Sequence, residues 1–275
     1  MNTDGKPALL RCSRLIRNNG QQGDTTVDTI VLETSSYLPL LWRTPYSQSV
    51  VEIMGRHRSN TRFVLQRDCI REAAAYFSFR EDWRYHPAIR FRRLAERLTD
   101  AQMKHLRFPS TAMQLLLGGN VWPQAQYLNF VRHMAFFCID LLDGVSFEDP
   151  RAGLLECAKR IEQRVGHFRA LLSMHERSSQ IHVPQEDILS YWGTWYLLPV
   201  PPPFVVEVVD DPVPFDKTGN RARDLYHYDC ALRLQPRASF VLVANTGFER
   251  NIRSSYRSMP VPVVCARASS ATIFA

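Results

Sequence analysis

Arginine side chains are the groups whose number and spacing point most directly to a chemistry in this sequence. The 275 residues include 34 basic and 27 acidic ones, and only four of the basic residues are lysine. A guanidinium group binds phosphate or carboxylate through two parallel hydrogen bonds, so this bias favours an anionic partner. The candidates for anion or RNA binding are Arg56, Arg58, Arg62, Arg90, Arg93 and Arg97.

Two interpretations of these arginines stay open. Arg90, Arg93 and Arg97 recur at helical spacing and would share one helix face, while the aromatic residues between positions 76 and 83 would offer surfaces for base stacking. In the alternative, the arginines form a solvated surface and pair with the acidic residues interleaved among them. The interleaving favours the solvated surface, so RNA binding is kept as the alternative function.

A second candidate site follows a run of prolines. Pro199, Pro201 and Pro202 remove backbone donors and predict a stiff, extended segment. The residues after them would present a linear peptide to another protein, with an aromatic ring filling an apolar pocket. The same residues also fit a buried edge strand. The candidates for partner binding are Pro199, Pro201, Pro202, Phe204, Glu207 and Val208.

Motifs of catalysis are missing from the sequence. It contains no Walker loop and no G-x-G-x-x-G, G-x-S-x-G, H-E-x-x-H or EF-hand pattern. His175 and His182 do not have a typical ligand spacing, and Asp210 with Asp211 fits a loop better than a metal site. We therefore expect no catalytic residues, no metal and no cofactor.

The elements that must position these groups are predicted from the spacing of apolar residues. The pattern indicates helices in the middle of the chain and short strands on either side. Apolar residues recur at helical spacing from 91 to 101 and from 154 to 172, and Asp149-Pro150 opens the second run as an N-cap and first helical residue. The best strand candidates are residues 26–41, 50–54, 62–65, 232–234 and 240–243. The predicted fold class is mainly α, with a helical core at about residues 68–192 and short β elements in the N-terminal and C-terminal parts.

Composition divides the chain into segments. We expect a flexible N-terminal arm at 1–25, a mainly helical core with short N-terminal strands at 26–198, a proline-rich strut and C-terminal segment at 199–250, and a poorly ordered basic tail at 251–275. The six cysteines show no C-x-x-C spacing, which predicts reduced, mostly buried thiols. No apolar run approaches the ~20 residues that cross a bilayer, so we expect no membrane partner.

Several short motifs, taken in order, resemble the non-structural protein NSs of phleboviruses. They comprise an R-x-P-Y-S element, a basic and aromatic stretch, central R-F-P and W-P pairs, and a late W-x-P-V-x-P-P run that leads into acidic residues. In this sequence the corresponding residues are Arg43–Ser47, His57–Arg58, Arg62–Leu65, Tyr76–Phe77, Leu98–Pro109, Trp122–Pro123 and Trp195–Glu207.

The resemblance implies a viral non-structural virulence factor that is not an enzyme and has a mainly helical core. Such a protein antagonises the host interferon response by binding and sequestering host proteins of interferon signalling or transcription. It also implies self-association, and a location in the host cell cytoplasm or in inclusion bodies, with the host nucleus as the alternative.

Overall fold

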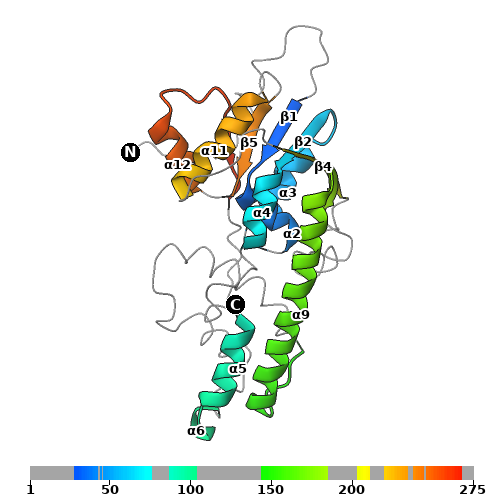
Figure 1. Cartoon of the computed structure of the whole chain (residues 1–275), viewed down its shortest axis with the longest axis vertical. Coiled ribbons are helices and arrows are strands. Elements are labelled where there is room, and N and C mark those ends of the chain that lie inside the picture. Colours follow the sequence, from blue (N-terminus) through cyan, green and yellow to red (C-terminus); the bar gives the residue numbers. More distant parts are fainter. Residues whose placement is uncertain are drawn as a thin grey trace, which may run out of the picture.

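A sheet of six strands is the central element, and the described part of the chain also contains eight helices, of which α5 and α6 lie away from the sheet (Figure 1). The computed structural model describes residues 28–42, 44, 46–75, 87–103, 144–184, 203–210, 220–234, 238–244 and 246–267. The strands are β1 (Asp28–Leu32), β2 (Thr61–Gln66), β3 (Gln180–Val183), β4 (Phe204–Val209), β5 (Ala238–Val243) and β6 (Val263–Cys265). The helices are α2 (Thr34–Leu41), α3 (Ser47–Arg56), α4 (Arg67–Ala75), α5 (Pro87–Arg97), α6 (Asp100–Met103), α9 (Pro150–Arg177), α11 (Asn220–Arg233) and α12 (Thr246–Ser255).

The strand order across the sheet is β3-β4-β2-β1-β5-β6, and only β3 runs antiparallel to its neighbour. The parallel strands run outward from β1 through β2 to β4, and the chain then returns to the other side of β1 to add β5 and β6. The direction of winding therefore reverses between β1 and β5. In open parallel sheets, this reversal is the place where the carboxyl ends of two strands leave room for a functional site.

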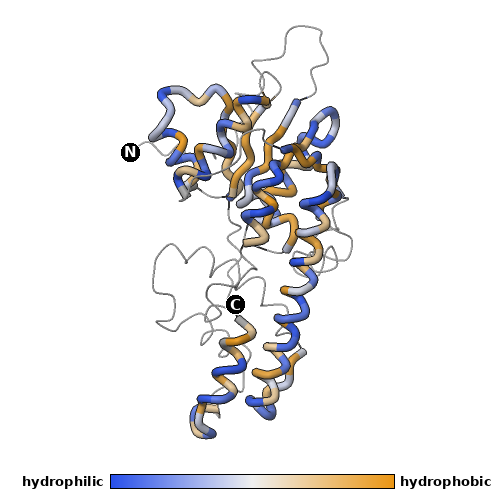
Figure 2. The backbone as a smooth tube through the Cα atoms, in the orientation of Figure 1, coloured by the Kyte–Doolittle hydropathy of each residue, from blue (hydrophilic) through white to orange (hydrophobic). Residues whose placement is uncertain are grey.

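Successive side chains of the strands point to opposite faces of the sheet and feed two separate cores. In β1, Ile30 and Leu32 belong to a large core with α2, α3, α4, α5 and α9, whereas Val31 belongs to a smaller one with α11 and α12. Figure 2 shows the strands as the most uniformly hydrophobic part of the chain, while the helices alternate between apolar and polar residues. A sheet covered on both faces explains the near-continuous apolar runs of its strands.

Helix α9 begins beside α5 and ends at the sheet (Figure 1). Its 28 residues span about 42 Å at ~1.5 Å per residue. The carboxylate of Asp149 accepts hydrogen bonds from the backbone N–H groups of Arg151 and Ala152, which confirms the predicted N-cap. Arg92 of α5 pairs with Glu162 of α9 at 2.5 Å. The two helices form an arm that extends away from the sheet.

The predicted fold class is wrong: the fold is mixed α/β and not mainly α. The helical core expected at 68–192 does contain α4, α5, α6 and α9, but these helices cover a sheet whose strands come from both ends of the chain. Each strand has six residues or fewer, so none gave a pattern as long as that of the helices. The pairing of distant strands leaves no trace in local periodicity.

Two local predictions fail because strand-like residues lie in helices. Residues 50–54 belong to α3, in which Val50 and Met54 are buried one helical turn apart. Residues 232–233 end α11, in which Tyr228 and Ala231 face the smaller core. Of the described residues in the stretch at 26–41, 28–32 form a strand, and α2 follows it.

The C-terminal segments are also more ordered than expected. Residues 246–255 form α12, and β6 extends the sheet beside β5, with Val241 opposite Val263. The tail expected from 251 is therefore part of the fold up to residue 267. The reason is burial, because Ile252 and Val261 are fully enclosed in the smaller core. The arm expected at 1–25 lies outside the described residues.

Candidate functional site

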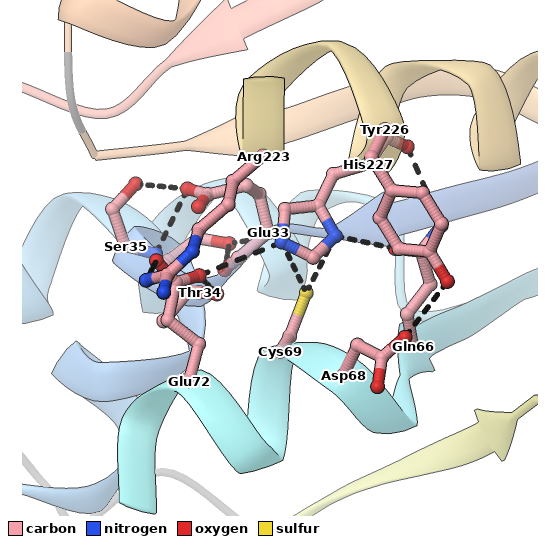
Figure 3. Close-up of polar contacts among 11 residues, drawn as sticks. Glu33, Thr34, Ser35, Gln66, Asp68, Cys69, Glu72, Arg223, Tyr226 and His227 are labelled. Atoms are coloured by element: carbon pink, nitrogen blue, oxygen red, sulfur yellow. Dashed lines mark hydrogen bonds and ion pairs between the residues drawn. The ribbon is translucent and has the colours of Figure 1, made fainter. Parts of the chain in front are cut away.

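Polar side chains gather at the carboxyl edge of the sheet, where β1 and β2 end and α11 crosses above them (Figure 3). We call this group the carboxyl-edge cluster. Its members are Glu33, Thr34, Ser35, Gln66, Asp68, Cys69, Glu72, Arg223, Tyr226 and His227. The cluster lies beside the winding reversal, because the backbone N–H of Glu33 donates to the carbonyl of Leu242 in β5 at 3.2 Å.

Glu33 is the acid that follows β1 and caps α2. Its carboxylate accepts hydrogen bonds from the backbone N–H of Ser35 at 2.8 Å and from the Ser35 hydroxyl. The side chain of Ser36 completes the capping box by accepting from the backbone N–H of Glu33 at 3.1 Å. The residue is only 6% exposed. Burial, with a further contribution from the nearby Glu72, raises the pKa of Glu33 to about 7.

Glu72 of α4 is the second acid, and unlike Glu33 it forms ion pairs within the described part of the chain, with His227 and Arg223. Its Oε2 accepts a hydrogen bond from the Thr34 hydroxyl at 2.6 Å and lies 3.5 Å from Nε2 of His227. Its Oε1 lies 3.4 Å from Arg223. Burial alone would raise the pKa of Glu72, but the hydrogen bonds from His227 and Thr34 hold it below its usual range. Glu72 is therefore the ionised acid of the pair.

His227 of α11 has contacts at both ring nitrogens. Nδ1 lies 2.6 Å from Oε1 of Gln66 and 3.6 Å from Sγ of Cys69, while Nε2 faces Glu72. Burial alone would lower the pKa of His227, but Cys69, Glu72 and Glu33 together raise it well above its ordinary value. An amide oxygen and a carboxylate both accept, so His227 is an imidazolium that donates from both nitrogens.

Two further contacts extend the cluster over α11 and α12. The Tyr226 hydroxyl donates to Asp68 at 2.7 Å, and the side-chain amide of Asn251 in α12 donates to Asp224 at 2.6 Å. Gln66 also donates to the backbone carbonyl of His227 at 3.3 Å. The polar contacts thus join α11 to α4, to α12 and to the end of β2.

Thiol, imidazole and carboxylate together are the groups that cysteine hydrolases use, but the arrangement here is different. Nδ1 of His227 lies 2.6 Å from Oε1 of Gln66 and 3.6 Å from Sγ of Cys69, and Nε2 lies 3.5 Å from Glu72. Cys69 is fully buried. The geometry is that of a charged contact that holds α11 in place.

The structure places the predicted partner peptide inside the sheet. Phe204 and Val208 lie in β4 and are 3% and 6% exposed, and β4 pairs with both β2 and β3. Glu207 forms a two-point contact with Arg62 of the neighbouring strand. The residues therefore form a buried strand as in the alternative interpretation, although the strand is internal and not at the edge. Pro199, Pro201 and Pro202 lie outside the described residues.

The two groups of arginines do not form one surface. Arg56 lies 3.7 Å from Glu52, Arg58 stacks on the Phe204 ring at 5.5 Å, and Arg62 pairs with Glu207. The second group, Arg90, Arg93 and Arg97, lies on α5 in the arm (Figure 1). The contacts of Arg56, Arg58 and Arg62 agree with the solvated and internally paired surface, and the other three arginines belong to a separate helix.

Other groups singled out from the sequence have separate positions. His175 is buried, with Nδ1 2.6 Å from the Tyr37 hydroxyl, and burial lowers the pKa of His175 to about 4. His182 lies on β3 and Asp210 pairs with Arg67. Within the described ranges, no set of three or more His, Cys, Asp or Glu residues is placed to hold a metal ion.

The cysteine prediction is confirmed for the four cysteines that the structure describes. All four are free thiols; Cys69, Cys157 and Cys230 are buried and Cys265 is half-buried. A membrane helix is not found among the described elements, since none is both long and apolar enough to cross a bilayer.

Sequence reasoning missed the carboxyl-edge cluster. Its signal was present: Glu33 directly follows the apolar run of β1, and Gln66 ends the predicted strand at 62–65. Cys69 and Glu72 are one turn apart on α4, which places them on the same side of the helix. His227 gave no signal, because its position depends on α11 crossing the edge of the sheet.

Comparison with protein-family models, with curated proteins and with solved structures finds no match.

Proposed function

We propose that this chain is a viral non-structural protein that antagonises the host interferon response by binding host signalling or transcription factors, without catalysing a reaction. The observation that carries the proposal is the ordered series of motifs similar to phlebovirus NSs, from Arg43–Ser47 to Trp195–Glu207. Each motif is short, and their common order is what supports the assignment.

Two residues of the motif Arg43–Ser47, Thr44 and Ser47, have a clear place in the fold. The hydroxyl of Ser47 donates to the carbonyl of Pro39 at 2.8 Å and accepts from the backbone N–H of Thr44 at 2.8 Å. The side chains of Thr44 and Ser47 are fully buried. Thr44 and Ser47 of this motif therefore serve the turn between α2 and α3.

The carboxyl-edge cluster supports a role in binding over a role in catalysis. Its base, His227, is held as an imidazolium between Gln66 and Glu72, and its thiol is enclosed. The described surface offers exposed apolar side chains on the arm, Leu155 and Met174, each 47% exposed.

The proposal is tested with the whole chain in cells that carry an interferon-β promoter reporter. We expect the chain to repress the reporter after stimulation with double-stranded RNA, and a tagged form to co-purify host factors of interferon signalling or transcription. A folded, expressed chain that leaves the reporter fully active would contradict the proposal.

Two variants separate the mechanisms. Cys69→Ala removes the thiol and should retain repression, whereas a catalytic mechanism that uses this thiol would lose it. Leu155→Ser with Met174→Ser changes only side chains that already face solvent, so the fold should persist. If the exposed apolar side chains of α9 contact the host factor, this double variant should weaken its capture. Unchanged capture would assign the contact to another surface.

A further inference from the structure

Helix α9 of the arm has an excess of basic residues. Its 28 residues include six arginine or lysine residues and three glutamates, and each glutamate forms an ion pair with an arginine. The pairs are Glu156–Arg160, Glu162–Arg92 and Glu176–Arg71. Two of the three arginines belong to α5 and α4, so the acids of α9 leave its own basic residues in excess.

Four of these basic residues lie on one side of the helix, and we call them the α9 basic face. An α-helix completes five turns in 18 residues, so side chains 18 positions apart project in the same direction. Arg151 and Arg169 are such a pair, and Lys159 and Arg177 are another. The second direction is rotated from the first by about 80°. All four residues are exposed to solvent, so the face is a surface and not a core contact.

The helix surface between these charges is low and open. Gly166, Ala170 and Ser173 are small, exposed residues among the four cations. A Cβ placed on Gly166 would meet no atom within 4 Å. The charged ends are therefore the outermost groups of the face over a length of about 39 Å, at ~1.5 Å per residue. Such a surface suits an extended anion better than a small one.

Neighbouring groups orient two of the cations without removing their charge. Arg177 donates to the backbone carbonyl of Ser173 at 3.1 Å, and Arg151 donates to that of Leu98 at 3.4 Å. Asp100 lies 3.6 Å from Arg151 and is 96% exposed at its side chain, so water screens this pair. The face therefore keeps a positive potential along its length.

We propose that the α9 basic face binds the phosphate backbone of a double-stranded nucleic acid. A duplex is an extended polyanion with one charge per ~1.7 Å of its axis, and arginine binds phosphate through two parallel hydrogen bonds. Within α9, all of which is described, Phe168 is the sole Phe, Tyr or Trp residue and is 3% exposed. The face thus has no ring on which the bases of a single strand would stack.

Two boundaries define the proposal. RNA and DNA duplexes both present a row of phosphates, so the face recognises chemistry that they share. None of the six arginines singled out from the sequence belongs to the face, which lies on α9 and not on α3, β2 or α5. The inference goes beyond the proposed function and does not depend on it.

Fluorescence anisotropy of a labelled RNA duplex of about 20 base pairs, titrated with the whole chain, tests the proposal. Each phosphate contact releases counterions, so the logarithm of the affinity falls by about 0.9 per contact for each unit of log salt concentration. Four contacts predict that affinity falls on the order of a hundredfold between about 50 and 200 mM salt. A DNA duplex of the same length, an RNA single strand and poly-glutamate are measured beside it.

Charge variants locate the contact on α9. Lys159→Gln with Arg177→Gln removes two of the four contacts, so binding at about 50 mM salt should weaken tenfold or more, and the loss over the same salt range should shrink to about tenfold. Arg250→Gln with Arg257→Gln is the matched control. It removes two charges from exposed positions on α12 and just after it, and should leave both values unchanged. Ala170→Lys adds a fifth cation and should increase the loss to about 500-fold.

Binding of both duplexes supports recognition of the shared backbone, and binding of one duplex alone assigns the face to that duplex. No binding, an affinity independent of salt, or equal losses in the two double variants would overturn the proposal. So would a single strand or poly-glutamate that binds as tightly as the duplexes. Circular dichroism checks the fold of each variant. If Lys159→Gln with Arg177→Gln does not fold, Ala170→Lys decides, since an unchanged salt dependence would exclude the face.

Discussion

Two acid–base pairs, one between helices at the edge of the sheet and one between strands, differ mainly in how far they lie from water. Glu72 and His227 at the carboxyl edge are 20% and 6% exposed at their side chains. Glu207 and Arg62, on neighbouring strands, are 32% and 36% exposed. Both pairs join elements that are far apart in the sequence, but only Arg62 and Glu207 were candidate site residues in the sequence.

The comparison teaches that burial, and not the type of pair, determines what each contributes. Water screens the Arg62–Glu207 pair, and exposed pairs of this kind contribute between about 0 and 1 kcal/mol. Removing one partner of a buried pair leaves an uncompensated charge and costs about 3–5 kcal/mol. The Arg62–Glu207 pair is a surface feature above a core strand, and the Glu72–His227 pair fastens α11 to the sheet.

The largest effect is expected when the buried pair is broken. His227→Ala leaves Glu72 and Glu33 without their buried cation and should lower the free energy of unfolding by about 3–5 kcal/mol at pH 7. Chemical denaturation measures it. His182→Ala, at an exposed position of β3, is the matched control and should change stability by less than about 0.5 kcal/mol. A loss for His227→Ala as small as that of the control would contradict the account.

The next largest loss of stability is expected in the core beneath the exposed Arg62–Glu207 pair, at Phe204 of the same strand as Glu207. Phe204→Ala removes a ring that packs edge-to-face on Phe63 at 5.6 Å and is 3% exposed. We expect a loss of about 3 kcal/mol in unfolding free energy, because the change creates a cavity in the core. Val205→Ala changes its 50% exposed neighbour and should cost much less. If Phe204→Ala kept full stability, the residue would be a surface contact after all.

A smaller effect concerns pH. Since the pKa of Glu33 is about 7 in the folded chain and about 4.5 when unfolded, the folded state binds more protons between these values. Stability should therefore fall by about 2 kcal/mol from pH 5 to pH 7. Denaturation curves at the two pH values measure the difference, and Glu33→Gln should reduce it. A rise in stability over this interval would show that another group dominates.

The smallest effect is expected at the exposed pair. Glu207→Gln removes the charge but keeps the size of the side chain, and it should change the unfolding free energy by less than about 1 kcal/mol. The change should shrink further in high salt, because screening weakens exposed pairs. A loss comparable to that of His227→Ala would erase the distinction between the two regions.

The sequence predicted those parts of the fold whose signals are local. The N-cap Asp149 and the apolar face from Leu154 to Leu172 led to α9. The strand at 62–65 was also predicted and is part of β2. Each depends on residues within one or two turns of each other.

The rest could not be predicted, because it depends on which distant segments lie together. The position of β5 beside β1 joins residues more than 200 positions apart, and Ser36 donates across that gap to the carbonyl of Leu242 at 2.7 Å. His227 reaches Glu72 only because α11 crosses the edge formed by β1 and β2. The candidate site was therefore missed although its acids follow recognisable elements.

The protonation state of His227 in the intact chain tests the central claim most directly. Long-range ¹H–¹⁵N spectra of ¹⁵N-histidine-labelled protein, with the His227 signals assigned by their loss in His227→Gln, report on both ring nitrogens. Our account predicts that Nδ1 and Nε2 are both protonated at pH 7. A neutral ring with one unprotonated nitrogen and an ordinary titration would contradict it, because the contact with Glu72 would then lack its positive charge.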